Sequence, residues 1–433
     1  DVRIVGTNAL RQAHRKQAFL ERAREALGHP IEIVSGVEEA RLIYGGVAHT
    51  SPAEPGRRLV CDIGGGSTEL IIGEGRAPIE LASLQMGCVN LSERWFPGGR
   101  LSAKRMAHAR LAARLEIEPV RARYRQLGWQ HVLGSAGSVR AVGECLREMD
   151  PAAIAITGEG LEALLAAMAK VDDVRDLELE SVTDERRDVF AGGVAILAEI
   201  FDSLALAEMR VADGGLREGL LYDMVGRLTN EDARERTVRA MQRRYQVDLA
   251  QAERVEATVL GFLGQVEAAW ELADPLAESV LRWGARLHEI GLDVAHNGYQ
   301  RHGAYLLEHA DMPGFSREEQ GLLARIVGAH RKRPVLEGLE RLVPPWDRRA
   351  RWLIVLLRLA VLLHRGRSGA ALPAIVLEAK GRTLTVRFPA RWLGEHALTV
   401  ADLQNEIDSL RSIDLRLRVY SARTQLAESA PAA

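Results

Sequence analysis

The segment from Leu59 to Ile72 constrains the fold of this chain more than any other. Its glycines and polar residues lie between two apolar runs: Asp62, Gly64, Gly65, Gly66, Ser67, Thr68 and Glu69. Both runs are short and β-branched, so we predict a strand, a tight turn and a second strand. Glycines let backbone N–H groups approach an anion closely, because no Cβ intervenes. The alternative is an ordinary glycine-rich hairpin.

The acids of this hairpin suit a hard cation. Asp62 and Glu69 would be poor phosphate ligands alone, but carboxylates bind Mg²⁺, which bridges to phosphate oxygens. No lysine follows the glycines and no helix opens there, so the motif is neither a P-loop nor a dinucleotide-binding turn. We predict that Asp62 and Glu69 hold Mg²⁺. The predicted phosphate-binding residues of the hairpin are Gly64, Gly65, Gly66, Ser67 and Thr68.

Composition sets broad limits. A chain of 433 residues has a prior of about three domains. The net charge of -2 identifies no anionic partner, so an anion site must come from local clustering. Three scattered cysteines fit a reducing compartment, and we expect a cytoplasmic protein. We find no signal peptide and no apolar run long enough to cross a membrane.

The chain changes character twice. Strand and helix patterns alternate up to a charged stretch at residues 227–236, helical periods follow, and a hairpin pattern begins after Pro373. The predicted parts are α/β segments at 1–44 and 45–226, an all-α domain at 231–367, a small α+β domain at 370–426 and a disordered tail at 427–433.

Four further residues follow strands at predicted helix starts, where anions are favoured. Arg11 lies near the start of a helix predicted over residues 9–27. Glu39 lies in the first helical turn after the capping residue Ser35. Arg217 follows a Gly-Gly pair, and Ser138 ends the small-residue loop 134–138. The alternatives are a solvated Arg11, a helix-dipole role for Glu39 and an ion pair for Arg217.

The sequence around His288 resembles the His-Asp core of HD-type phosphohydrolases, with Glu289 in place of the aspartate. That family also needs a later aspartate, and the position where we expect it is occupied by Val361. It needs an earlier histidine as well, but no histidine occurs between residues 132 and 287. His302 and His330 are the remaining candidates. We therefore predict a structural relic and not a working metal site.

Basic residues cluster in the predicted all-α domain. They form a candidate track for a long polyanion: Arg331, Lys332, Arg333, Arg348, Arg349 and Arg358. The alternative is a set of solvated helix faces. Only Trp346 and Trp352 supply rings there, so we expect no nucleic-acid partner.

Five motifs together resemble the exopolyphosphatase/guanosine pentaphosphate phosphatase family in order and spacing: residues 6–11, 35–43, 62–69, 134–138 and 213–219. The resemblance implies an α/β actin-like (ribonuclease-H-like) core with the first lobe at 1–44 and the second at 45–226. A degenerate HD-like all-α domain and a small α+β domain would follow, as in the long bacterial form. The family begins with an earlier phosphate loop, so we expect the N-terminal lobe to be incomplete here.

The resemblance also implies a reaction, which is Mg²⁺-dependent hydrolysis of a terminal phosphate by a homodimer. Glu39 would orient and deprotonate water, while Arg11 and Arg217 balance charge. Residues 96–99, 213–216 and 329–332 look more like the exopolyphosphatase branch, so inorganic polyphosphate is the expected substrate. Guanosine pentaphosphate is the alternative within the family. A kinase of the same fold and a non-catalytic polyanion-binding or sensing protein are alternatives from other classes.

Overall fold

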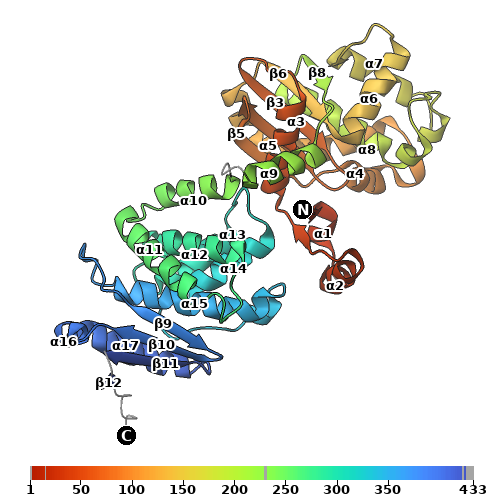
Figure 1. Ribbon diagram of the computed structural model, residues 1–433. Helices are drawn as coiled ribbons and strands as arrows, with labels where there is room; N and C mark the ends of the chain where they lie inside the picture. The colour runs from red at the N-terminus through yellow and green to blue at the C-terminus, as the bar shows by residue number, and fades with distance from the viewer. Residues whose placement is uncertain (1, 15, 229–231, 422–423, 426–433) are drawn as a thin grey trace. The chain divides into compact units, whose positions relative to one another are not determined.

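The computed structural model in Figure 1 divides the chain into two compact units, residues 1–233 and 234–433. The division falls within the charged stretch at 227–236. The predicted tail at 427–433 lies outside the described residues. The structure describes residues 2–14, 16–228, 232–421 and 424–425.

A six-stranded mixed sheet forms the centre of the first unit. Its strand order is β5-β4-β3-β6-β8-β7, with β3, β4 and β5 antiparallel and with β6 and β8 parallel to β3. The predicted strand–turn–strand hairpin is confirmed as β3 and β4. The strands are β3 (Arg57–Ile63), β4 (Thr68–Glu74), β5 (Ala77–Leu84), β6 (His131–Ser135), β7 (Ile156–Thr157) and β8 (Glu208–Val211).

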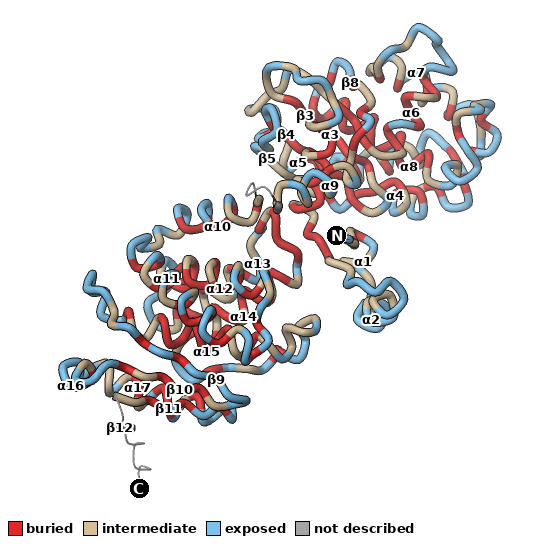
Figure 2. Tube along the Cα trace, viewed as in Figure 1, coloured by how far each residue is buried: buried red, intermediate tan, exposed pale blue. Residues whose placement is uncertain are grey.

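Alternate residues of the central strands face opposite sides of this sheet. Leu59 and Cys61 belong to a large core on the side of α4, α5, α6 and α8, whereas Val60 and Ile71 pack with the apolar residues of α3. Figure 2 shows the central strands β3 and β4 as mostly buried. The helices that follow β5 in the chain are α4 (Cys88–Trp95), α5 (Ala103–Leu127), α6 (Ala136–Met149), α7 (Gly158–Met168), α8 (Asp184–Leu204) and α9 (Leu216–Leu228).

Helices α3 (Gly36–Thr50) and α9 pack with their backbones almost in contact. A Cβ added at Gly46 would lie 1.9 Å from the Gly215 carbonyl oxygen, and one added at Gly219 would lie 1.8 Å from the Leu42 carbonyl oxygen. Only glycine fits at these two crossing points, because any side chain would collide with backbone atoms.

The start of the chain forms a small parallel pair, β1 (Ile4–Gly6) and β2 (Ile31–Ile33), with two helices between them. The helix predicted over residues 9–27 is divided into α1 (Asn8–Gln12) and α2 (Lys16–Leu27), because Ala13 has an extended backbone.

Three arginines join this segment to α3 and α9 through one acid. Arg3, Arg41 and Arg227 all form ion pairs with Asp223, at 2.6, 2.5 and 3.0 Å. Burial alone would raise the pKa of Asp223, but the nearby guanidinium groups lower it to about 2. The acid is therefore charged at any ordinary pH and holds three segments together.

The second unit has one hydrophobic core shared by its helices and its sheet. The sequence predicts an all-α and an α+β domain here, and the structure packs both on the same buried side chains. The sheet order is β12-β11-β10-β9. The elements are α10 (Ala233–Arg244), α11 (Leu249–Val266), α12 (Pro275–Leu287), α13 (Tyr299–His309), α14 (Arg317–Ala329), α15 (Trp346–Leu363), β9 (Val376–Lys380), β10 (Thr383–Phe388), α16 (Trp392–Glu395), α17 (Ala397–Arg411), β11 (Arg416–Ser421) and β12 (Thr424–Gln425). Among the described helices, none is long and apolar enough to span a membrane.

Candidate active site

A row of four polar residues crosses the sheet of the first unit from strand to strand. Asp62 in β3 lies directly opposite Glu69 in β4, and these two lie opposite Ser135 in β6 and Ser83 in β5. Ser83 Oγ donates a hydrogen bond to Glu69 Oε1 at 2.8 Å, and Ser135 Oγ donates to Asp62 Oδ2. Strand register therefore places two buried carboxylates side by side, with Asp62 held by Ser135 and Glu69 held by Ser83 and Ser67.

Two like charges in directly opposite positions destabilise a sheet. Asp62 and Glu69 are also buried, at 8% and 1% exposure. Burial raises the pKa of Asp62 to about 6, and nearby Glu39 adds to that rise. Burial, with the charges of Glu39 and Asp62, raises the pKa of Glu69 to about 8. This concentration of acid has a cost for the fold, which is typical of functional sites.

Glu39, at the start of α3, lies close enough to Asp62 and Glu69 for its charge to raise their pKa values. Ser35 caps this helix, and its Oγ accepts a hydrogen bond from the Glu38 N–H at 3.1 Å. Arg11 Nη1 donates to Glu39 Oε2 at 2.8 Å and to the Val34 carbonyl at 3.0 Å. Burial raises the pKa of the Glu39 carboxyl, and Arg11 opposes this rise. The structure thus brings together Glu39, Arg11, Asp62 and Glu69.

Glu38 and Glu39 are neighbours with different surroundings. Both Glu38 oxygens accept hydrogen bonds from Arg41 at 2.8 Å, and Arg41 also pairs with Asp223. Glu38 is fully buried in this structural network. Only Glu39 is available to the carboxylate row.

The glycine turn between β3 and β4 is partly open to solvent, with Gly65 exposed. Gly64 N–H donates to the Ser67 carbonyl at 3.0 Å and closes the turn. The buried Thr68 hydroxyl donates to the Met86 carbonyl at 2.7 Å. These two residues have structural partners in this state, and the buried Ser67 hydroxyl is bonded to Glu69, so the groups left to meet a phosphate are the backbone N–H groups of Gly65, Gly66 and Ser67.

Two other predicted residues, Arg217 and Ser138, form no hydrogen bond or ion pair with the described residues of this cluster. Arg217 is exposed in the first turn of α9 and forms no ion pair with a described residue. The expected alternative partner, Glu218, instead accepts a hydrogen bond from the Gly215 N–H. Ser138 is buried in α6, close to Gly193 of α8. Phosphate binding by Ser138 and charge balance by Arg217 stay predictions.

The sequence interpretation omitted three polar residues of the site: Ser83, Ser135 and Asn8. Ser83 and Ser135 hold the carboxylates through strand pairing. Asn8 belongs to α1 and lies against the glycine turn, where a Cβ added at Gly66 would be 2.5 Å from Asn8 Oδ1. Asn8 and Ser135 lie within the predicted motifs 6–11 and 134–138 but were given no role there, and Ser83 belongs to no local motif. Ser83 and Ser135 do lie near strand ends, which is a weak signal.

The carboxylate row fits a hard divalent cation. Among the described residues, no three His, Cys, Asp or Glu side chains are grouped so as to hold a metal ion by themselves. Mg²⁺ commonly takes one or two carboxylates and completes its shell with water and substrate phosphate. Asp62 and Glu69 match that pattern, and burial, with the charge of nearby Glu39, raises the pKa of both.

The pH dependence of stability tests this reading of the acids. A carboxyl whose pKa rises from 4.5 to about 8 on folding stabilises the fold at low pH, and this contribution is lost as pH rises through that interval. We therefore expect Glu69→Gln, in EDTA, to raise the free energy of unfolding at pH 8.5 on the order of 1–3 kcal/mol. At pH 4.5 the gain should vanish.

Urea unfolding at the two pH values measures this difference. Glu74→Gln is the matched control, because Glu74 ends the same strand and is exposed. Equal changes in the free energy of unfolding of Glu69→Gln at both pH values would show that ionisation of Glu69 does not destabilise the fold.

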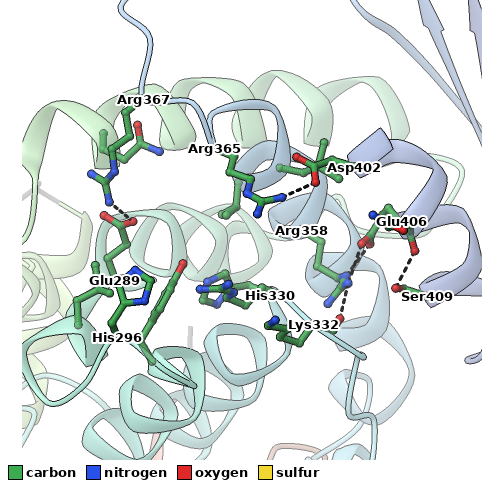
Figure 3. A pocket seen from close by; sticks show the side chains of 17 residues that line it. Glu289, His296, His330, Lys332, Arg358, Arg365, Arg367, Asp402, Glu406 and Ser409 are labelled. Carbon is green, nitrogen blue, oxygen red and sulfur yellow. Dashed lines mark hydrogen bonds and ion pairs between the residues drawn. The ribbon is translucent and has the colours of Figure 1, made fainter. Parts of the chain in front are cut away.

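Part of the predicted polyanion track is wrong. Arg358 is buried at 3% exposure, and Figure 3 shows it paired with Glu406, at 2.6 and 2.7 Å. Its remaining donors reach the carbonyls of Ala329 and Lys332. Its charge is therefore neutralised inside the second unit, because a buried arginine needs an acid partner.

The other cations of the track differ in their surroundings. Lys332, Arg333 and Arg348 are exposed, while Arg331 lies over the ring of Tyr299 at 4.5 Å. Arg349 lies within 4 Å of Glu271 and Asp274. Arg331 and Lys332 also line the cavity of about 510 Å³ drawn in Figure 3. The segment 331–333 is the best remaining candidate for contact with a long anion.

Two buried histidines, His288 and His330, lie near the same cavity with ring centroids 5.4 Å apart. Each Nδ1 lies within hydrogen-bond distance of the backbone carbonyl three residues earlier. The Glu289 carboxylate, 3.9 Å from His288 Nε2, is already paired with Arg367 at 2.6 Å. The interpretation of this region as a structural relic stays a prediction.

Comparison with known proteins gives consistent matches. The model of the Ppx/GppA phosphatase family matches residues 1–228, and the model of Ppx/GppA phosphatase domain III matches residues 233–407. A guanosine-5'-triphosphate,3'-diphosphate pyrophosphatase of Vibrio cholerae is 41% identical over 96% of this chain and 82% of its own length. A protein of the same name from Aeromonas hydrophila is 38% identical over 98% and 85%. The solved structure of an exopolyphosphatase from Cytophaga hutchinsonii matches with a TM-score of 0.47 and 22% identity, over 52% of this chain and 74% of its own.

Proposed function

This chain belongs to the Ppx/GppA phosphatase family, and from this we propose that it hydrolyses the terminal phosphoanhydride bond of guanosine pentaphosphate. The observation that carries the proposal is the group of Glu39, Asp62 and Glu69 with Arg11 beside an open glycine turn. The names of the Vibrio and Aeromonas relatives support this substrate over polyphosphate, which the sequence motifs favoured.

Asp62 and Glu69 are the residues that would hold Mg²⁺. A bound Mg²⁺ supplies charge stabilisation to phosphoryl oxygens when it is present. Ser135 and Ser83 fix the two carboxylates so that their free oxygens keep one orientation. The N–H groups of the Gly65–Ser67 turn then bind the oxygens of the terminal phosphate.

Glu39 acts as the general base in this proposal. It takes a proton from water as the water oxygen attacks the terminal phosphorus, and the bond from that phosphorus to the bridging oxygen breaks. Guanosine tetraphosphate and orthophosphate leave. The raised pKa of Glu39 brings it closer to the operating pH, which favours base catalysis. Arg11 orients Glu39 and balances charge on the transferring group, and we assign Arg217 the same balancing role.

Exopolyphosphatase activity is the second candidate. The exposed cations Lys332 and Arg333, with the half-buried Arg331 next to them, favour it, because three adjacent charges suit a substrate with one charge per phosphate. Guanosine pentaphosphate is too short to need an extended track. A cytoplasmic homodimer, as the family resemblance implies, is part of either proposal.

Initial rates of orthophosphate release compare the candidates directly. Guanosine pentaphosphate and long polyphosphate would be offered to the same enzyme preparation with Mg²⁺, and kcat/KM compared. We expect the nucleotide to be the better substrate by tenfold or more, equivalent to about 1.4 kcal/mol in transition-state binding. A higher kcat/KM for polyphosphate would establish the second candidate, and binding of both without release would identify a non-catalytic polyanion sensor.

A further inference from the structure

Asn8 presents a buried hydrogen-bond donor that has no partner. Its side chain is 92% buried, since 8% is exposed, and its Nδ2 finds no acceptor among the described residues. The oxygen of the same amide lies against the glycine turn, where a Cβ added at Gly66 would be 2.5 Å from Asn8 Oδ1. A buried donor without an acceptor costs about 1–3 kcal/mol, so this position calls for an explanation.

Arg11 carries a second such donor on the same short helix. Its Nη1 donates to Glu39 and to the Val34 carbonyl, but its Nη2 is buried without a partner among the described residues. Residues 8 and 11 are three apart in α1 and therefore share one face. Two unsatisfied donors therefore belong to one short helix, one on a side chain that contacts the turn and one on a side chain that contacts Glu39.

The chemistry of these groups selects the ligand. A guanidinium nitrogen is only a donor, and so is the amide nitrogen of asparagine, so a metal ion cannot bind either. An anionic oxygen satisfies both. The Asn8 side chain fills the space where a Cβ of Gly66 would lie, whereas Gly65 is exposed and presents its backbone to solvent without a Cβ.

We propose that Asn8 is a substrate-binding residue whose amide, together with the second nitrogen of Arg11, donates hydrogen bonds to oxygens of the phosphoryl group held at the Gly64–Ser67 turn. This inference rests on the proposed function and assigns a further residue to the same site. It gives α1 the role of a second wall for the anion, opposite the β3–β4 turn.

Orthophosphate binding to the full chain tests the assignment without turnover. Titration calorimetry with Mg²⁺ would compare wild type, Asn8→Ala, Asn8→Asp and the control Gln12→Ala. Gln12 ends the same helix and is exposed. We expect Asn8→Ala to weaken orthophosphate binding about tenfold, in line with a hydrogen bond to a charged group, and Asn8→Asp to weaken it further by repulsion. Gln12→Ala should bind as wild type does.

Thermal unfolding of the unliganded variants separates binding from packing. Asn8→Ala removes an unsatisfied donor, so its melting temperature should stay within a few degrees of wild type, and Asn8→Ser should recover part of the affinity. Unchanged orthophosphate affinity in Asn8→Ala would overturn the inference. So would a wild-type chain that binds no orthophosphate. Wild-type binding that depends on Asn8, without phosphate release from either substrate, would support the inference and reject the proposed function.

Discussion

Replacing Glu39 with glutamine is expected to lower the rate of phosphate release by about 10²–10⁴-fold, the usual effect of losing a general base. Glutamine keeps the size of the side chain and its contact with Arg11, but it cannot take a proton from water. Substrate affinity should change little, since the turn and the strand carboxylates remain. Single-turnover rates and equilibrium binding of guanosine pentaphosphate measure the two quantities separately.

Glu38→Gln is the matched control, because the two acids are adjacent in the first turn of α3. Glu38 is fully buried and bonded to Arg41, so this variant should lose stability on the order of 2 kcal/mol. Its turnover, measured where it is fully folded, should match wild type. A Glu39→Gln enzyme with full turnover would remove Glu39 from the mechanism.

Replacing Arg331, Lys332 and Arg333 with alanine is expected to weaken the binding of long polyphosphate by about 10²-fold at 0.1 M salt. This estimate takes three phosphate contacts, each adding about 0.7 to the slope of log affinity against log salt. Binding of short oligophosphates should barely change, because the carboxylates and the glycine turn are untouched. Long-chain degradation should become distributive, since the chain would dissociate between cleavages.

Gel analysis of partly digested polyphosphate shows the difference. Processive cleavage leaves full-length and fully degraded material, and distributive cleavage leaves a ladder. A triple variant of Arg382, Arg416 and Arg418 removes the same charge from another surface of the second unit and is the control. If the 331–333 variant gave no ladder and kept the wild-type salt slope, this segment would be only a solvated face.

The hairpin at the centre of the site could be predicted because its signals are local. Two β-branched runs, three glycines and two acids occupy fourteen consecutive residues, and the structure has the strands and turn in that order. The same holds for the capping of α3 by Ser35. Each depends on neighbours within a few positions.

Residues that depend on distant partners could not be found in this way. Ser135 meets Asp62 only because β6 pairs in parallel with β3, 73 positions away in the chain. Arg358 was placed on a surface track because its acid partner, Glu406, lies 48 positions later. The unsatisfied amide of Asn8 depends on where α1 meets the turn, which no periodicity reveals.

The glycine contacts between α3 and α9 have a mechanical consequence. Helices separated by side chains can slide past each other as those side chains change rotamer, but here backbone meets backbone at Gly46 and Gly219. The two helices therefore move as one rigid unit, which the salt bridges from Arg41 and Arg227 to Asp223 also hold together. Glu39 belongs to α3 and Arg217 belongs to α9. A tilt of α9 would therefore move α3 with it, and the Glu39 carboxylate with α3.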